Sequence, residues 1–305
     1  WMLIWWITEC VPMAITSLLP VMLFPLLGVM SLEKTCITYS NRYVFLFLGG
    51  FFIALAMEKW NLHRRLALSI VNRTGTSANT IIFGFMLASF SISMWISNTA
   101  TTLMMLPIAA SVVLLLVKPG EESSDRGTRN FATALMLSIA YGASIGGIAT
   151  LVGSPPNASM AGILDKSFSH TVSFFDWMAW GLPFSLALLV CAYMLMVWVV
   201  FPNKLGRFPL GQAIISSELA LLGSWKREEK IVFGIFVSTA VLWMLQEPMS
   251  SILKPMGIEF SDTAIALIMG CSMFLIPASN KTEHLLEWRD TEKLPWGVLL
   301  MFGGG

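Results

Sequence analysis

The sequence consists largely of apolar runs, several of them long enough to cross a lipid bilayer. A bilayer core about 30 Å thick needs roughly 20 consecutive apolar residues in a helix that rises about 1.5 Å per residue. The runs lie at about 1–30, 43–57, 80–96, 99–117, 131–165, 176–201, 231–253 and 262–277. Because 56% of the 305 residues are hydrophobic and only 12% are charged, we expect an all-α, polytopic membrane protein surrounded by the lipid bilayer.

Basic residues are unevenly placed, although their total is balanced. Nineteen Lys and Arg face eighteen Asp and Glu, so net charge gives no argument for a nucleic-acid partner. Fifteen of the nineteen lie in the polar connections 58–79, 118–130, 202–230 and 279–296. Because cytoplasmic loops retain Lys and Arg during insertion, we expect these four segments to be cytoplasmic in a plasma (inner) membrane protein.

Two other local patterns add expectations. Segment 58–79 mixes basic residues such as Arg64 and Arg65 with aliphatic ones, which predicts an amphipathic helix lying in the membrane interface. The four cysteines are far apart and form no CxxC pair, so we expect small core residues and neither a disulfide nor a metal site. They are Cys10, Cys36, Cys191 and Cys271.

A polar tripeptide, Ser97-Asn98-Thr99, separates the apolar arms at 80–96 and 99–117. This pattern predicts a helical hairpin whose tip lies at membrane depth, where irregular backbone needs protein or a water-filled cavity around it. A second arm that starts near Asn98 would turn its N–H groups toward an anion such as a carboxylate. Ser93 and Ser97, predicted on one helical face, would suit sodium. The alternative is that these hydroxyls only join helices by hydrogen bonds.

A second interruption lies in the run 131–165, at Gly153-Ser154-Pro155-Pro156-Asn157. Two prolines remove two backbone donors, so the helix must unwind and restart near Pro156. Two broken membrane elements in one half of a chain are typical of carriers that bind near the bilayer midplane. A proline kink with glycines allowing close packing is the simpler alternative.

Two segments of similar sequence are predicted to enter the membrane from opposite sides. Phe47-Leu48-Gly49-Gly50 begins a segment on the side with few basic residues, and Met301-Phe302-Gly303-Gly304 begins one on the basic side. This relation suggests an inverted repeat. Because the sequence begins inside an apolar run at Trp1 and stops at Gly305, we expect a fragment whose second repeat is truncated.

Two long motifs, SISMWISNTATTLMMLPIA and YGASIGGIATLVGSPPN, closely resemble the signature regions of the divalent anion/sodium symporter family. These are sodium-coupled carriers of dicarboxylates, citrate and sulfate. The resemblance extends over essentially the whole chain, including FLFLGGFFIALAMEKWNLHRRLAL and LPWGVLLMFGGG, which would be the N-terminal two-thirds of such a carrier. It implies a homodimer with a scaffold domain, a transport domain and an elevator-type mechanism.

The resemblance also implies roles for individual residues. Sodium would be ligated by Ser93, Ser97, Asn98 and Gly153, and the substrate site would be lined by Asn98, Thr99, Ser154 and Pro155. The second Ser-Asn-Thr of the family pattern is absent from this sequence, so a second sodium site and half the substrate contacts would lie outside it. We expect sodium-coupled symport of a dicarboxylate of the succinate, malate or fumarate class, with sulfate or citrate as the alternative.

An enzyme is the alternative from another class. Gly142-Ala143-Ser144-Ile145-Gly146 matches G-x-S-x-G, which would make Ser144 the nucleophile of an intramembrane serine hydrolase. The pattern follows an apolar helix where a hydrolase needs a strand, and no histidine lies at membrane depth. There is also no nucleotide-binding P-loop. We therefore expect a secondary transporter and no enzyme.

The expected organisation has seven parts. They are scaffold helices at 1–57, an interfacial helix at 58–79, a transport-domain hairpin at 80–117, a cytoplasmic loop at 118–130, a broken helix at 131–165, mainly scaffold helices at 166–278, and an interfacial segment with the start of the second repeat at 279–305.

Overall fold

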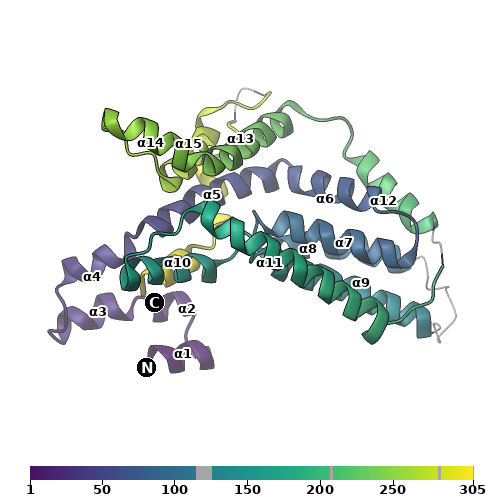
Figure 1. The fold of residues 1–305 in the computed structure, drawn as a ribbon, viewed down its shortest axis with the longest axis horizontal. Helices are drawn as coiled ribbons and strands as arrows, with labels where there is room; N and C mark the ends of the chain where they lie inside the picture. The colour runs from purple at the N-terminus through teal and green to yellow at the C-terminus, as the bar shows by residue number, and fades with distance from the viewer. Residues whose placement is uncertain (115–125, 207–208, 281–282, 305) are drawn as a thin grey trace. The chain divides into compact units, whose positions relative to one another are not determined.

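The computed structural model describes residues 1–114, 126–206, 209–280 and 283–304 (Figure 1). Within these ranges the chain is helical and no element is a strand, apart from one isolated bridge between Pro277 and His284. The all-α prediction is confirmed. The first part of the predicted loop 118–130 lies outside the described residues, and residues 126–130 belong to a helix.

The chain divides into two compact units. Unit 1 contains Trp1–Ala56, Pro155–Phe174 and Ile231–Gly305, and unit 2 contains Met57–Ser154 and Phe175–Lys230. Unit 2 contains all but one of the predicted site residues, namely Ser93, Ser97, Asn98, Thr99, Gly153 and Ser154. The exception is Pro155, which is the first residue of the second segment of unit 1.

Unit 1 is built around close contacts between helices. Gly49 packs so tightly that an added Cβ would lie 2.4 Å from the backbone carbon of Ala266, and the rings of Phe52 and Phe274 meet edge to face at 5.1 Å. These contacts join α5 to α15. The helices of unit 1 are α1 (Met2–Thr8), α2 (Met13–Thr16), α3 (Leu19–Leu26), α4 (Leu32–Tyr39), most of α5 (Arg42–Lys59), α10 (Pro155–Phe168), most of α13 (Arg227–Met244), α14 (Gln246–Leu253), η2 (Lys254–Met256), α15 (Asp262–Leu275), η3 (Trp288–Lys293) and α16 (Trp296–Gly304).

Unit 2 holds the hairpin. Helix α7 packs against α6 on one side and most extensively against α9, and α8 also contacts α9. The capping box of Ser77 and Thr80 fixes the start of α7, because each side chain bonds the backbone of the other residue. The helices of unit 2 are α6 (Leu62–Arg73), α7 (Ala78–Ser93), α8 (Asn98–Leu114), α9 (Arg126–Gly146), almost all of α11 (Phe174–Met194), the π-helix η1 (Leu195–Val200) and α12 (Pro209–Leu221).

In the described part of the chain, the helices long and apolar enough to span a membrane are fewer than the apolar runs of the sequence. Among the described residues, two continuous segments are long and apolar enough to cross a bilayer, Leu32–Lys59 and Phe174–Val200. A third is possible if Arg227–Met244 and Gln246–Met256, which are bent by 70° at their junction, form one span. The hairpin arms α7 and α8 are apolar but shorter, with 16 and 17 residues.

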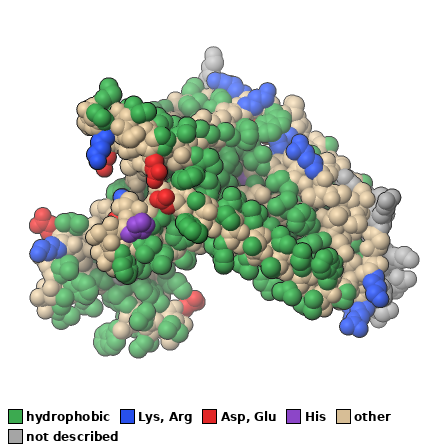
Figure 2. Space-filling model, in the orientation of Figure 1, with side chains coloured by type: hydrophobic (Ala, Val, Ile, Leu, Met, Phe, Trp, Pro, Cys, Tyr) green, Lys and Arg blue, Asp and Glu red, His purple; other side chains and the backbone are tan. Residues whose placement is uncertain are grey.

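The segment Phe174–Val200 presents large apolar side chains at its surface, and Figure 2 shows hydrophobic side chains along it. Trp180 is 84% exposed and Trp198 is 65% exposed. Apolar side chains without protein cover are costly in water but not against lipid tails. This surface therefore fits a membrane environment.

Two local expectations differ from the structure. All four cysteines are exposed and free, so the prediction that they are core residues is wrong: an apolar run does not say which of its faces packs inward. The segment predicted as one interfacial helix begins with the end of α5, and α6 starts at Leu62 after Asn61, whose φ is 56°. That left-handed residue turns the chain between the two helices.

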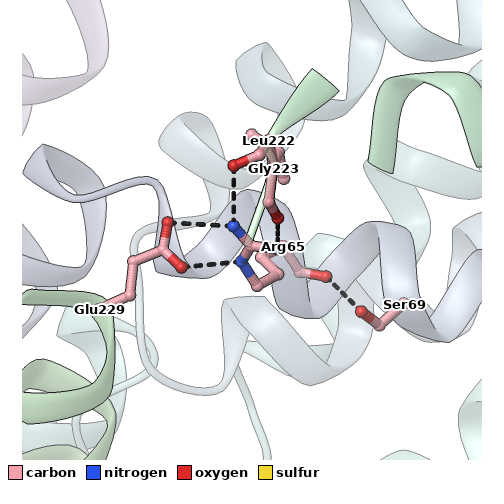
Figure 3. A network of polar contacts seen from close by, with 5 residues as sticks. All are labelled: Arg65, Ser69, Leu222, Gly223 and Glu229. Atoms are coloured by element: carbon pink, nitrogen blue, oxygen red, sulfur yellow. Dashed lines mark hydrogen bonds and ion pairs between the residues drawn. The ribbon is translucent and has the colours of Figure 1, made fainter. Parts of the chain in front are cut away.

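Arg65 of α6 is the centre of a buried polar network (Figure 3). Its Nε donates to Glu229 Oε2 at 2.8 Å and its Nη2 to Oε1 at 3.2 Å, while Nη1 and Nη2 also donate to the carbonyls of Gly223 and Leu222. Only 5% of the Arg65 side chain and 4% of the Glu229 side chain are exposed. The network fixes α6 to the first turn of α13 and to the residues just before that helix. Neither the charge of Arg65 nor its spacing in the sequence predicted that it would be buried inside unit 2.

Glycines of α9 bring its backbone directly onto α7. An added Cβ at Gly142 would lie 2.4 Å from the carbonyl oxygen of Met86, and one at Gly146 would lie 2.2 Å from that of Phe90. Since both obstacles are backbone atoms, neither can move away without moving a helix. These contacts hold the end of α9 beside the end of α7.

We expect Gly146→Ala to lower the free energy of unfolding by about 1–3 kcal/mol, because the new methyl group forces α9 away from α7. A matched control is Gly234→Ala in α13, where an added Cβ meets nothing within 4 Å and removal of a helical glycine gains about 0.5–1 kcal/mol. Unfolding of the full-length protein in detergent measures both. Equal stability of the two variants would contradict the close packing.

Candidate functional site

The hairpin turns between Ser93, the last residue of α7, and Asn98, the first residue of α8. The Ser97 hydroxyl accepts a hydrogen bond from the Ala100 N–H at 3.2 Å, so Ser97 caps α8. Ser93 is fully buried whereas Ser97 is exposed. The expectation that these two hydroxyls share one helical face is therefore wrong, because α7 ends before Ser97.

Asn98 is the residue around which the tip is organised. Its Oδ1 accepts a hydrogen bond from the Ser93 hydroxyl at 2.6 Å, which ties the two arms together. Its amide also lies against Gly147, where an added Cβ would be 2.6 Å from Oδ1. Glycine at 147 is thus what allows the Asn98 side chain to occupy this position.

The second break is longer than the sequence predicts. Helix α9 ends at Gly146 and α10 begins at Pro155, with the two prolines in its first turn as expected. Residues 147–154 are outside both helices, and the chain tightens first through bonds from Ile148 N to Ile145 O and from Ala149 N to Gly146 O. Unwinding therefore starts six residues before the predicted Gly153.

The hairpin tip and the break contact each other within unit 2. The Thr150 hydroxyl donates to the carbonyl of Met94, which follows α7 directly. An added Cβ at Gly153 would lie 2.7 Å from Gly147 O and 3.1 Å from Met94 O. The structure thus brings Ser93, Asn98 and Gly153 to one place, together with two carbonyl groups that the sequence did not single out.

The atoms gathered there suit a hard cation. Hydroxyl, amide and carbonyl oxygens are the ligands that such ions prefer, whereas transition metals favour histidine and cysteine. No group of three His, Cys, Asp or Glu side chains that could hold a metal occurs in the described part of the chain. The oxygen set is neutral, so a bound ion would bring net positive charge to the tip.

The start of α8 has the properties of an anion-binding site, next to the oxygens that suit a cation. Helix geometry leaves the N–H groups of Asn98 and Thr99 without partners inside the helix, and the positive end of the helix dipole lies there. Thr99 is exposed and Ser154 is half-buried. A carboxylate could therefore be bound beside the cation, although Pro155 belongs to the other unit.

Helix α11 packs against the break through Trp177 and the backbone at Gly181. The indole N–H of Trp177 donates to Ile148 O at 3.0 Å, and an added Cβ at Gly181 would lie 3.0 Å from the same oxygen. Trp177, Met94 and Thr150 were missed by sequence reasoning. Only the Gly146-Gly147 pair carried a local signal, since adjacent glycines before a broken helix indicate close backbone approach.

Ser144 has no hydrolase geometry. It lies inside α9, a continuous helix, and it is exposed. The nucleophile elbow requires a strand before the serine, and the described residues contain no strand element.

Apolar helices with two interrupted elements that meet through main-chain and neutral side-chain oxygens define an integral membrane transporter. The family model described as "Sodium:sulfate symporter transmembrane region" matches residues 1–305. The chain therefore belongs to the sodium:sulfate symporter family, whose members are transporters and not enzymes.

Relatives of known name agree with this membership. The sodium-dependent dicarboxylate transporter SdcS of Staphylococcus aureus, in strains NCTC 8325 and COL, is 40% identical over 314 residues. The match covers 100% of this chain and 59% of SdcS, so the chain spans about three-fifths of the length of these relatives.

Proposed function

We propose that the protein is a sodium-coupled symporter of a dicarboxylate of the succinate, malate or fumarate class, and that this chain carries one of its sodium sites. The observation that carries the proposal is the contact between hairpin tip and helix break, where Ser93 bonds Asn98 at 2.6 Å and Gly153 packs against Met94 O and Gly147 O. Similarity to SdcS favours the dicarboxylate, and sulfate or citrate is the alternative suggested by the family.

Sodium binds first in the proposed mechanism. Its ligands are the oxygens of Ser93, Ser97, Asn98 and the Gly153 backbone, and Ser97 has to turn inward from its exposed position to join them. Binding replaces the Ser93–Asn98 hydrogen bond by coordination to both side chains. The ion neutralises the negative ends of these dipoles and orders the tip.

The dianion then binds beside the ion. Asn98 and Thr99 present the N-terminus of α8 to one carboxylate, and Ser154 and Pro155 are the further substrate contacts that we propose. Because two carboxylates repel one another and the neutral oxygens of the tip, the anion needs the preceding positive charge. Transport therefore requires sodium.

The remaining features of the proposal concern assembly and placement. The carrier works as a homodimer by an elevator-type movement in the plasma membrane. Segments 58–79, 118–130, 202–230 and 279–296 face the cytoplasm, which is supported by their fifteen basic residues.

The proposal is tested by uptake into proteoliposomes that contain the full-length protein. With labelled succinate, citrate and sulfate supplied separately, we expect succinate uptake in sodium chloride and none when choline replaces sodium. Uptake of sulfate alone would favour the alternative substrate. Succinate uptake that is equal in choline would contradict sodium coupling.

A further inference from the structure

Two buried hydroxyl groups on the hairpin have no hydrogen-bond partner. Within the described residues, the buried side-chain atoms without a partner are Thr16 Oγ1, Ser89 Oγ, Thr101 Oγ1 and Asp262 Oδ1. Ser89 lies on α7 and Thr101 on α8, and both residues are completely buried. Each hydroxyl has lost its water contacts and has gained nothing in exchange.

Other hydroxyl groups in unit 2 satisfy their hydrogen-bonding capacity in the usual way for a helix. Ser91, Thr102 and Ser138 each donate to a backbone carbonyl three or four residues earlier in the same helix. Ser89 and Thr101 lie in equally regular helices but make no such bond. Their hydroxyls are thus available to a buried ligand within unit 2.

The register of the arms relates both residues to the candidate sodium site. Ser89 precedes Ser93 by four residues on α7, and Thr101 follows Asn98 by three on α8, so each lies one turn along the same face of its helix. The arms are joined at the level of Ser93 and Asn98 by their 2.6 Å hydrogen bond. Moving one turn away from the tip on both arms leads to Ser89 and Thr101.

One helical turn rises about 5.4 Å, and two successive O–H···O hydrogen bonds of about 2.8 Å each span nearly the same distance. The spacing between the level of Ser89 and Thr101 and the level of Ser93 and Asn98 therefore matches the length of one bridging water molecule. A buried water typically makes about three hydrogen bonds to polar groups that would otherwise be unsatisfied. Here the water would have three partners: hydrogen bonds to the two hydroxyls and a coordination bond from its oxygen to the cation.

We propose that Ser89 and Thr101 are positioning residues of the sodium site, holding one water molecule that ligates the ion from inside the hairpin. The inference rests on the proposed sodium site at Ser93 and Asn98 and extends it by one turn. The water gives the ion an inner oxygen ligand that the backbone of a regular helix cannot supply. Neither hydroxyl touches the transported anion.

The test measures sodium binding to the full-length protein by the thermal shift between sodium chloride and choline chloride. We expect Ser89→Ala and Thr101→Val to raise the half-saturating sodium concentration about five- to tenfold, the effect of losing one hydrogen bond. Thr101→Ser, which keeps the hydroxyl, should restore sodium binding close to that of the unmodified protein. In choline the melting temperature should not fall, because the hydroxyls have no protein partner to lose.

Three results would overturn the inference. They are an unchanged sodium requirement in both variants, a Thr101→Ser variant as impaired as Thr101→Val, and a lower melting temperature in choline. Asn98→Ala serves as the reference: if it loses the sodium response while Ser89→Ala and Thr101→Val keep it, the inner water is excluded and the tip site stands. If Asn98→Ala itself responds to sodium normally, the proposed function fails.

Discussion

Replacing Asn98 by alanine is expected to abolish sodium-dependent uptake. Asn98 contributes the oxygen that accepts from Ser93, and its amide fills the space against Gly147. The substitution removes a proposed sodium ligand and a substrate contact at once. Uptake of labelled succinate by the full-length protein in sodium and in choline measures the loss.

The control for Asn98→Ala is Ser111→Ala on the same helix. Ser111 is more than three turns from the tip and donates only to Pro107 O. We expect its uptake to equal that of the unmodified protein. Asn98→Ala leaves the Ser93 hydroxyl without its partner and should cost only about 1–3 kcal/mol of stability, so the protein remains folded. Retained sodium-dependent uptake in a folded Asn98→Ala variant would exclude the tip as the site.

The second large effect is expected on stability, from Glu229→Ala. This substitution leaves the Arg65 guanidinium buried with two carbonyl groups and the Trp225 ring, whose centroid lies 5.3 Å away, but without a counter-ion. Breaking a buried ion pair by removing one partner costs about 3–5 kcal/mol. The free energy of unfolding of the full-length protein in detergent is the quantity to measure.

A matched control exists in the same unit. Arg64 and Glu218 form a closer ion pair, at 2.6 Å, but 36% and 25% of their side chains are exposed. Glu218→Ala removes the same charge and should cost about 0–1 kcal/mol. The double variant Arg65→Met with Glu229→Leu should recover most of the loss, because apolar side chains replace both charges. A loss below 1 kcal/mol in Glu229→Ala would show that the pair is solvated.

Much of the candidate site follows from local sequence. Helix α8 begins at Asn98, as the polar tripeptide predicts, because Ser97 satisfies a first-turn N–H through its own side chain. Helix α10 begins at Pro155, because the N–H that proline lacks would have no partner in the first turn of a helix in any case. These boundaries depend on interactions within four residues, so the sequence is sufficient to locate them.

Contacts between distant segments were not predictable in the same way. The Thr150 hydroxyl reaches a carbonyl 56 residues earlier in the chain, and Arg65 pairs with a glutamate 164 residues later. A backbone carbonyl carries no residue signature, so Met94 O and Gly147 O could not be recognised as part of the site. Nor does a run of apolar residues reveal that Ser93 is buried while Ser97 is exposed.

The sequence by itself therefore determined an all-helical membrane protein with two interruptions, because hydrophobic length, helix caps and prolines act locally. Only the tertiary structure decided that the interruptions meet, that unwinding begins at Gly147, and that Arg65 is buried against Glu229. The reason is physical: close approach of two backbones depends on which residues of the neighbouring helix a glycine faces, and that is set by the packing of the whole unit.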